Sequence, residues 1–233
     1  MGAGFFVAAG FIPACSFVSL TVFVTLLLMK KTILFLTLGL GLSTAAQAQY
    51  RGRGGNVSLG IKAGASLTSF VGADANPLGA NYDYRFGFNA GVFANIGFAK
   101  LFAFQPELLY SQKGAKLDNN SDIGIRLHYV DVPLAFHVNT DGFFFEAGPQ
   151  VGFLVAAKSE IGSVSVDTKD SYKSVDFGYL AGLGYQLKHG LGVGLRYNGA
   201  FTNFPKSYTV GNVTQQQRQR NSAFQLYATY SFN

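Results

Sequence analysis

Four charged residues that lie far apart in the sequence could perform acid–base chemistry if the fold brings them together. They are Glu107, Asp131, Glu146 and Arg196. Paired carboxylates beside a cation are typical of general acid–base sites, but inside a protein the same residue types also neutralise one another as a buried ion-pair network. No nucleophile and no metal-ligand spacing accompanies them. We therefore predict a structural polar network, which includes the amides of Gln105 and Gln150.

The histidines and one acidic stretch are the other residues that could bind a metal. His128, His137 and His189 show no H-x-x-x-H or other metal-ligand spacing. The stretch DNNSD (118–122) lacks the ladder of ligands that an EF-hand loop carries, so a turn-rich loop is expected there. The sequence therefore predicts no metal site and no cofactor.

Two arginines near the C-terminus are candidates for anion binding. Arg218 and Arg220 lie in TQQQRQRN (214–221). Guanidinium groups form charge-assisted hydrogen bonds with phosphate, so these residues could contact lipopolysaccharide if the protein lies in an outer membrane. A solvated loop is the simpler interpretation of the same stretch.

The elements that would position these residues are β-strands. In LFAFQPELLYSQKGAKL (101–117), every second residue from Phe102 to Tyr110 is apolar or aromatic. The alternate positions include Gln105 and Glu107. This alternation is typical of a strand with one apolar and one polar face. We expect eight such strands, with no amphipathic helix between them, at 57–69, 84–98, 101–113, 125–138, 143–157, 174–188, 190–203 and 222–232.

The connections between these segments alternate in length. The short ones are 99–100, 139–142 and 188–190, and the long ones are 70–83, 114–124, 158–173 and 204–221. A transmembrane β-barrel has this asymmetry, because its periplasmic turns are short, its external loops are long and an even number of strands returns the chain to the periplasm. We therefore predict an all-β fold, an eight-stranded antiparallel up-and-down transmembrane β-barrel.

The two faces of the strands agree with this prediction. The residues expected to face lipid carry no charge: Phe86, Phe88, Val92, Ile96, Phe102, Phe104, Leu108, Val130, Val132, Leu134, Phe136, Phe177, Tyr179, Leu183, Val193, Leu195, Tyr197, Phe224, Leu226, Tyr230 and Phe232. The other face combines glycines with a few charged residues, which suits a narrow barrel whose interior is filled by side chains. A lipocalin-like barrel would need an apolar interior and a charged exterior. Glu107 is therefore expected to face the lumen.

Composition is more typical of a membrane protein than of a soluble one. Only 13% of the residues are charged, against about 25% in ordinary soluble domains. Removing the predicted signal peptide takes away two of the 18 basic residues and none of the 12 acidic ones, so the mature net charge is +4. This charge is too small to predict nucleic-acid binding. The single cysteine, Cys15, precedes the mature chain, which therefore has neither a disulfide nor a thiol nucleophile.

The N-terminal part predicts export. Residues 29–48 combine a basic start (MKK), an apolar stretch (TILFLTLGLGL) and an A-x-A cleavage pattern before Gln49. The uncharged apolar segment 1–28 is either a transmembrane anchor or translated sequence upstream of the true start; we favour the second interpretation, because a complete signal peptide begins at Met29. The predicted order is an upstream segment (1–28), a signal peptide (29–48), a short basic lead (49–56) and the barrel domain (57–233).

Several motifs follow one another in a characteristic order. After LGIKAGAS come QPELLYSQKGAK (105–116), YVDVPLAF (129–136), FFFEAGPQVG (143–152) and GYLAGLGYQL (178–187). Together they resemble the PorT-like outer-membrane β-barrel family of Bacteroidetes-type bacteria, over essentially residues 57–233. The resemblance implies an eight-stranded barrel in a Gram-negative outer membrane, and the founding member of the family is associated with protein secretion. The chain departs from the usual aromatic C-terminus of such barrels, because Asn233 follows Phe232.

These observations predict a non-enzymatic, monomeric scaffold or interaction module in the cell outer membrane that acts through long external loops. Its expected partners are outer-membrane lipid and lipopolysaccharide, with secretion-machinery or surface proteins implied by the resemblance. A lipid A-modifying barrel enzyme is the alternative; it would need a Ser or Asp beside His128, which is near the rim with the long loops. A small-solute pore is less favoured, because side chains fill the lumen of an eight-stranded barrel.

Overall fold

The computed structural model describes residues 56–73, 82–117, 120–210, 213–215 and 217–232. The predicted upstream segment, signal peptide and most of the basic lead lie outside the described residues. Within the described ranges, no helix is long and apolar enough to cross a membrane.

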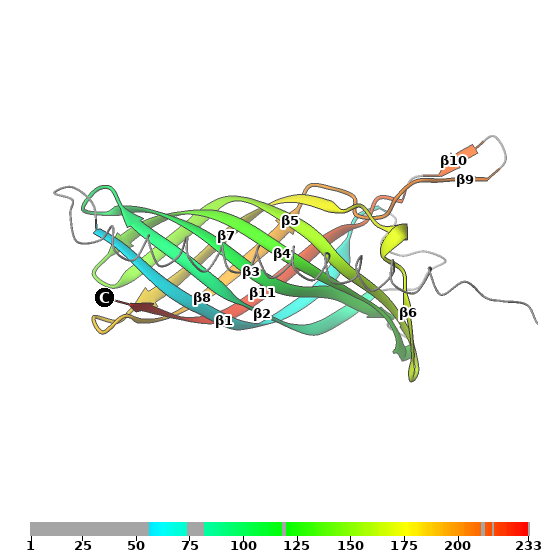
Figure 1. Cartoon of the computed structure of the whole chain (residues 1–233), viewed down its shortest axis with the longest axis horizontal. Helices are drawn as coiled ribbons and strands as arrows, with labels where there is room; N and C mark the ends of the chain where they lie inside the picture. The colour runs from blue at the N-terminus through cyan, green and yellow to red at the C-terminus, as the bar shows by residue number, and fades with distance from the viewer. Residues whose placement is uncertain (1–55, 74–81, 118–119, 211–212, 216, 233) are drawn as a thin grey trace, which may run out of the picture. The chain divides into compact units, whose positions relative to one another are not determined.

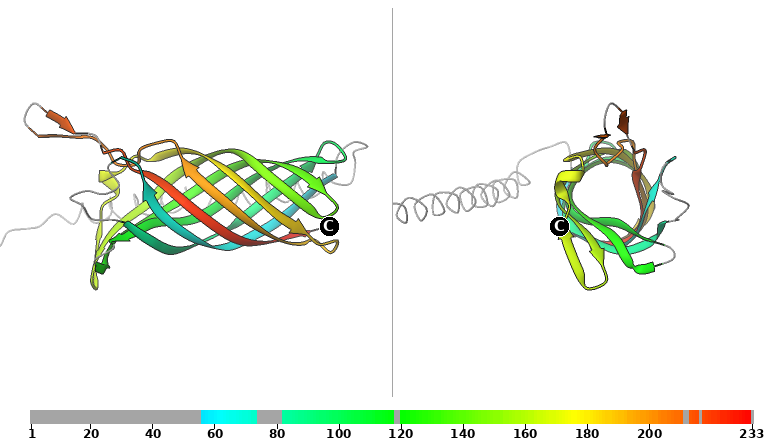
Figure 2. Two further views of the ribbon diagram at one scale, coloured as in Figure 1. Left: turned by 180° about the vertical axis from the view of Figure 1, so that it is seen from behind. Right: turned by 90° about the vertical axis from the view of Figure 1, so that its right-hand side faces the viewer.

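The described residues form β-strands and one short 3-10 helix. In chain order these are β1 (Asn56–Val71), β2 (Tyr82–Gly97), β3 (Phe102–Leu117), β4 (Asn120–Thr140), β5 (Phe143–Ile161), β6 (Val164–Asp167), the 3-10 helix η3 (Lys169–Ser171), β7 (Val175–Gln186), β8 (Leu191–Ala200), β9 (Tyr208–Val210), β10 (Val213–Gln215) and β11 (Arg220–Phe232). β1 to β5, β7, β8 and β11 close into one antiparallel barrel, in which β1 pairs with β11 (Figures 1 and 2). The predicted eight-stranded up-and-down barrel is confirmed.

The distribution of apolar and charged side chains is the reverse of that in a soluble barrel. All the residues predicted to face lipid lie exposed or half-buried, and Phe86 is 77% exposed. The charged side chains of Glu107, Asp131, Glu146 and Arg196 are at most 3% exposed. Because a sheet alternates its side chains between two faces, the period-2 pattern places every second residue in the lumen. The outer face is therefore an apolar belt suited to lipid.

The turns at the C-terminal end of the barrel are short, as predicted. Between β4 and β5, Asp141 and Gly142 both have positive φ angles, 46° and 91°. Two-residue hairpin turns favour this backbone because its twist matches that of the flanking strands. This end is therefore the periplasmic end of the barrel, where turns are short.

The strands at the opposite end are longer than predicted. The prediction of a loop at 114–124 is wrong, because β3 continues to Leu117 and β4 begins at Asn120. The expected loop 158–173 contains the end of β5, all of β6 and η3, and the expected loop 204–221 contains β9 and β10. All four residues of β6 are exposed, so this strand needs no apolar alternation and the sequence pattern ends before it.

Apolar side chains fill the lumen at this external end. The cluster, which we call the apolar plug, consists of Phe70, Ala115, Leu127, Tyr129, Leu154, Ala157, Tyr172 and Phe204. The ring of Phe204, 1% exposed, lies 4.6 Å from that of Phe70 and 5.5 Å from that of Tyr172. Lys173 N–H donates to the carbonyl of Phe204 at 2.8 Å, which ties the segments after η3 and after β8 to one another.

Candidate functional site

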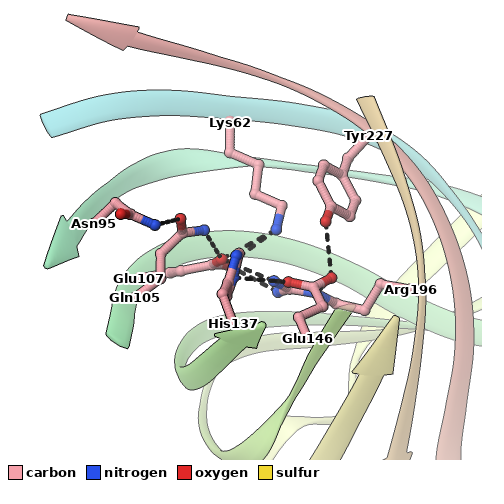
Figure 3. A network of polar contacts seen from close by, with 8 residues as sticks. All are labelled: Lys62, Asn95, Gln105, Glu107, His137, Glu146, Arg196 and Tyr227. Atoms are coloured by element: carbon pink, nitrogen blue, oxygen red, sulfur yellow. Dashed lines mark hydrogen bonds and ion pairs between the residues drawn. The ribbon is translucent and has the colours of Figure 1, made fainter. Parts of the chain in front are cut away.

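A polar network lies inside the barrel, with Arg196 of β8 at its centre (Figure 3). The guanidinium Nη1 and Nη2 donate to the two carboxylate oxygens of Glu107 on β3, each at 2.8 Å. Its Nε and Nη2 donate to the two oxygens of Glu146 on β5, at 2.8 and 2.5 Å. Lys62 of β1 lies 3.1 Å from Glu107 Oε1 through its Nζ. The side chains in these ion pairs are fully buried.

The charges in this network balance. Two carboxylates, Glu107 and Glu146, face two cations, Lys62 and Arg196. The ring of Tyr227 on β11 supports both cations, because Lys62 Nζ lies 3.6 Å and Arg196 Cζ 5.4 Å from its centroid. A buried charge is tolerated when it is paired and its remaining hydrogen-bond capacity is used, and this arrangement satisfies that condition.

Polar side chains extend the network around the lumen. Gln105 Nε2 donates to Glu107 Oε1 at 2.9 Å, and Asn95 Nδ2 donates to Gln105 Oε1 at 2.9 Å. His137 Nε2 lies 3.3 Å from Glu146 Oε2, and the Tyr227 hydroxyl donates to Glu146 Oε1 at 2.8 Å. The participating residues come from β1, β2, β3, β4, β5, β8 and β11. The network therefore connects strands that are not neighbours in the barrel.

Glycines leave the space that these large side chains occupy. A Cβ on Gly182 of β7 would lie 2.7 Å from Glu146 Oε1, and a Cβ on Gly194 of β8 would lie 2.5 Å from the ring of Tyr227. A Cβ atom essentially never lies this close to another non-bonded heavy atom, so a side chain at either position would force its neighbours to shift. The glycine-rich strands β7 and β8 thus allow a narrow barrel to hold an Arg, two Glu and a Tyr at one level.

A second polar cluster lies nearer the apolar plug. Lys113 Nζ donates to Asp131 Oδ1 at 2.9 Å and lies 4.5 Å from the ring centroid of Tyr129. Asn221 Nδ2 donates to Asp176 Oδ2 at 2.9 Å. The predicted grouping of Asp131 with Glu107 therefore differs from the observed one. Asp131 lies opposite Leu109 in register, two residues along β3 from Glu107, but its ion-pair partner is Lys113.

The structure also separates the other predicted site residues. Gln105 belongs to the first network, whereas Gln150 lines a small cavity beside the second cluster, together with Lys113 and Asp176. Arg218 and Arg220 are both exposed, at the external end of β11 and just before it. Their role in lipopolysaccharide binding stays a prediction.

His128 points away from these networks. Its Nδ1 lies 2.5 Å from the Tyr110 hydroxyl, and both side chains are part-buried. Tyr110 belongs to the apolar register of β3, so the pair lies on the outer face. His137 lies in the lumen and His189 in a short turn. No cluster of three or more His, Cys, Asp or Glu residues suited to a metal occurs among the described residues.

Several network residues were not predicted from the sequence. They are Lys62, Asn95, Lys113, His137 and Tyr227. The sequence carried the clearest signal for Lys62, because this lone cation lies between Ile61 and Ala63, which are both exposed on the lipid face. A charge that alternates with lipid-facing residues indicates a lumen position.

A cavity remains between the first network and the short turns. This vestibule has a volume of about 430 Å³ and is lined by amide and hydroxyl groups, among them Asn95, Gln105, Asn139, Gln186 and Thr229. The network closes its inner end, since Gln105 and His137 also line it. The first network can neutralise its own charges and hold the strands together. Its carboxylates, Glu107 and Glu146, already bind cations and, in the case of Glu146, the hydroxyl of Tyr227.

The chain matches one family model, and its structure is similar to several solved structures. The family model described as outer membrane protein beta-barrel domain matches residues 45–205. The structure is similar to Neisserial surface protein A, with 14% identity and a TM-score of 0.48 over 76% of this chain and 99% of that chain. It is also similar to Ail, the attachment invasion locus protein of Yersinia pestis, solved with the heparin analogue sucrose octasulfate. The identity is 14% and the TM-score is 0.44, over 77% of this chain and 100% of that chain.

A third similar structure is OprG from Pseudomonas aeruginosa, with 11% identity and a TM-score of 0.41 over 76% of this chain and 96% of that chain. No curated protein sequence matches this chain.

Proposed function

The chain belongs to the outer membrane protein beta-barrel domain family, and on this premise we propose that it is a non-enzymatic scaffold that binds other proteins at the cell surface. The protein is an outer-membrane β-barrel, so its external hairpins face the surroundings of the cell. A link to protein secretion, as in PorT-like proteins, is part of this proposal.

One observation carries the proposal: the β5–β6 hairpin presents apolar side chains outside the barrel. Ile161, Val164 and Val166 are 61%, 60% and 53% exposed. Val164 pairs with Ile161 and Val166 with Ser159, so the three apolar residues lie at the end of one hairpin. Apolar residues grouped on a solvated element are typical of an interaction surface. Figure 1 shows this hairpin and the β9–β10 hairpin extending beyond the end of the barrel opposite the C-terminus.

The edge of β6 supports the same proposal. Among the described strands β6 pairs with β5 alone, and all four of its residues are exposed. An open strand edge offers unpaired N–H and C=O groups to which an extended segment of a partner can add. The filled lumen agrees with an external site of action, because the polar network and the apolar plug occupy it at two levels.

The test compares matched variants in cells that lack the chromosomal gene. The triple variant I161T/V164T/V166T makes the hairpin polar but keeps β-branched residues. Its control, V57T/L101T/L187T, changes three exposed apolar residues at the short-turn end. We expect the wild type and the control to restore the wild-type profile of secreted and surface proteins, measured by mass spectrometry, and the hairpin variant to fail although it is inserted at normal levels. Full restoration by the hairpin variant would contradict the proposal.

A lipid A-modifying enzyme is the second candidate, because the Tyr110 hydroxyl and the His128 imidazole are in hydrogen-bond contact on the outer face. Among the described residues, however, Tyr110 is the hydrogen-bond partner of His128, and neither Ser nor Asp takes that place. The same cells distinguish the two candidates. A change in lipid A mass that depends on the gene and is lost in His128→Gln would establish the enzyme and contradict the scaffold.

A further inference from the structure

A basic pocket lies on the external part of the barrel, away from the lumen networks. It has a volume of about 340 Å³ and is lined by Tyr84, Arg85, Phe86, Lys116, Arg126, Glu160 and Gly162. All but Gly162, which directly follows β5, come from β2, β3, β4 and β5, which lie side by side in the barrel. The pocket is therefore formed by the sheet itself and not by a single loop.

One carboxylate fixes two of the cations in this pocket. Glu160 pairs with Arg85 through Oε2 and with the Nε of Arg126 through Oε1, the latter at 3.0 Å. Within the described part of the chain, Lys116 makes no ion pair, and the Arg126 side chain stays 35% exposed. The lining holds three cations and one carboxylate. Asp83 of β2, which pairs in register with Lys116, adds a second carboxylate beside the pocket, so the cations exceed the carboxylates by one. Arginines held by a carboxylate keep their remaining N–H groups in a fixed direction, which suits a tetrahedral anion.

The pocket lies at the border of the apolar belt. Along the external half of β5, the apolar residues Phe153 and Val155 are exposed, and the next exposed position is Lys158. Lys158 pairs in register with Arg126 on β4 and is itself exposed, so it adds a further cation beside the pocket. This border is on the side of the long hairpins, which is the external side. The cations therefore lie at the level of the headgroups of the outer leaflet.

An apolar groove begins at the wall of this pocket. Phe86 lines the pocket and also the groove, which has a volume of about 530 Å³ and runs over β1, β11, β8 and β7 past Leu67, Phe224 and Leu195. The groove is part of the lipid-facing surface. An amphiphile whose charged group occupies the pocket would have its chains beside this groove.

We propose that the basic pocket binds a phosphate group of lipid A in the outer leaflet. Arg126 and Lys116 donate to the phosphate, and Arg85, held by Glu160, completes the positive wall. Tyr84 and Phe86 flank the headgroup, as aromatic residues do at membrane interfaces. The site differs from the pair Arg218 and Arg220 suggested by the sequence, and it does not depend on the scaffold proposal.

The test measures lipid binding to the purified full barrel in detergent. The variant K116Q/R126Q removes two positive charges from the pocket. The control K100Q/K188Q removes two positive charges from exposed positions in the short turns at the opposite end. The probes are bisphosphorylated lipid A, lipid A without its phosphates and phosphatidylglycerol, each titrated by native mass spectrometry. Resistance of the folded band to heat in gel electrophoresis shows that each variant has folded.

We expect bisphosphorylated lipid A to bind the wild type and the control equally. It should bind K116Q/R126Q about tenfold more weakly, which corresponds to about 1.4 kcal/mol. The dephosphorylated lipid should bind all three proteins weakly. Equal binding of lipid A to wild type and K116Q/R126Q, or equal binding of the phosphorylated and dephosphorylated forms, would overturn the site. Binding of phosphatidylglycerol as tight as that of lipid A would overturn the assignment to lipid A.

Discussion

Arg196 on β8 and Glu107 on β3 are 89 positions apart in the sequence, yet two hydrogen bonds of 2.8 Å join them across the lumen. Arg196 also binds Glu146, so one guanidinium links three strands that do not pair with one another. Backbone hydrogen bonds hold each strand only to its two neighbours. The ion pairs therefore add a connection across the barrel that the sheet itself cannot provide.

This connection predicts strong coupling between the two residues. Glu107→Ala and Arg196→Ala each leave buried charge uncompensated, a change that typically costs about 3–5 kcal/mol. The double variant restores neutrality and should cost less than the sum of the single variants. Unfolding by urea in detergent measures the three free energies. Because the sequence contains no tryptophan, unfolding is monitored by tyrosine fluorescence or circular dichroism. Strict additivity would show that the pair does not interact.

The glycine positions predict a steric effect that can be relieved. Gly194→Ala should lower the free energy of unfolding, because its Cβ would meet the ring of Tyr227 at 2.5 Å. Replacing the ring as well, in Gly194→Ala/Tyr227→Leu, should cost less than the two single changes together. The measurement is the unfolding midpoint of the four proteins in one detergent. A full additive loss in the double variant would contradict the close approach of Gly194 and Tyr227.

The apolar plug predicts different effects for two phenylalanines only three residues apart. Phe204 is 1% exposed and packs inside the lumen, whereas Phe201 is 65% exposed on the outer face. Phe204→Ala should cost about 3–5 kcal/mol, as is usual for a buried phenylalanine, and Phe201→Ala should cost clearly less. Unfolding midpoints and proteolysis of the segment after β8 measure the difference. Equal losses of unfolding free energy in the two variants would contradict the tight packing of Phe204 in the apolar plug.

The ion pairs at the external rim predict a dependence on pH. Partial burial raises the pKa of Glu160, but the hydrogen bond and charge of Arg85 and the charge of Arg126 outweigh it and hold the pKa below its ordinary value of 4.5. A group with a lowered pKa stabilises the folded state above its unfolded pKa and loses that contribution as the pH falls. Glu160→Gln should therefore lower the melting temperature at pH 7, and the difference from wild type should shrink below about pH 4.5. A difference that is constant from pH 7 to pH 3 would contradict these ion pairs.

The barrel was predictable from the sequence because the membrane imposes a simple rule on each strand. Residues such as Phe86, Leu195 and Leu226 must be apolar where they face lipid, so their alternation marks each crossing. The external hairpins were not predictable in the same way. All four residues of β6 are exposed, so no alternation in its side chains is required.

The polar network was predictable only in part. The orientation of Glu107 and Arg196 toward the lumen follows from strand periodicity, because a residue faces inward when its neighbours face outward. Their partners depend on the height of each residue along the barrel, which is set by strand register and by irregularities such as the shift between Tyr84 and Asn89. Such shifts are not visible in a single sequence. Asp131 lies opposite Leu109, between Glu107 and Lys113 on the same face of β3, and alternation alone does not say which of the two it contacts; its partner is Lys113.

The polar network and the apolar plug close the lumen at two levels, and we propose that the protein acts through its external surface. Ion current across a planar lipid bilayer that contains the purified wild-type barrel measures whether the lumen conducts. We expect no conductance above that of the bare bilayer in 1 M salt. Stable current steps from the wild-type protein would contradict this expectation and would identify the barrel as a pore.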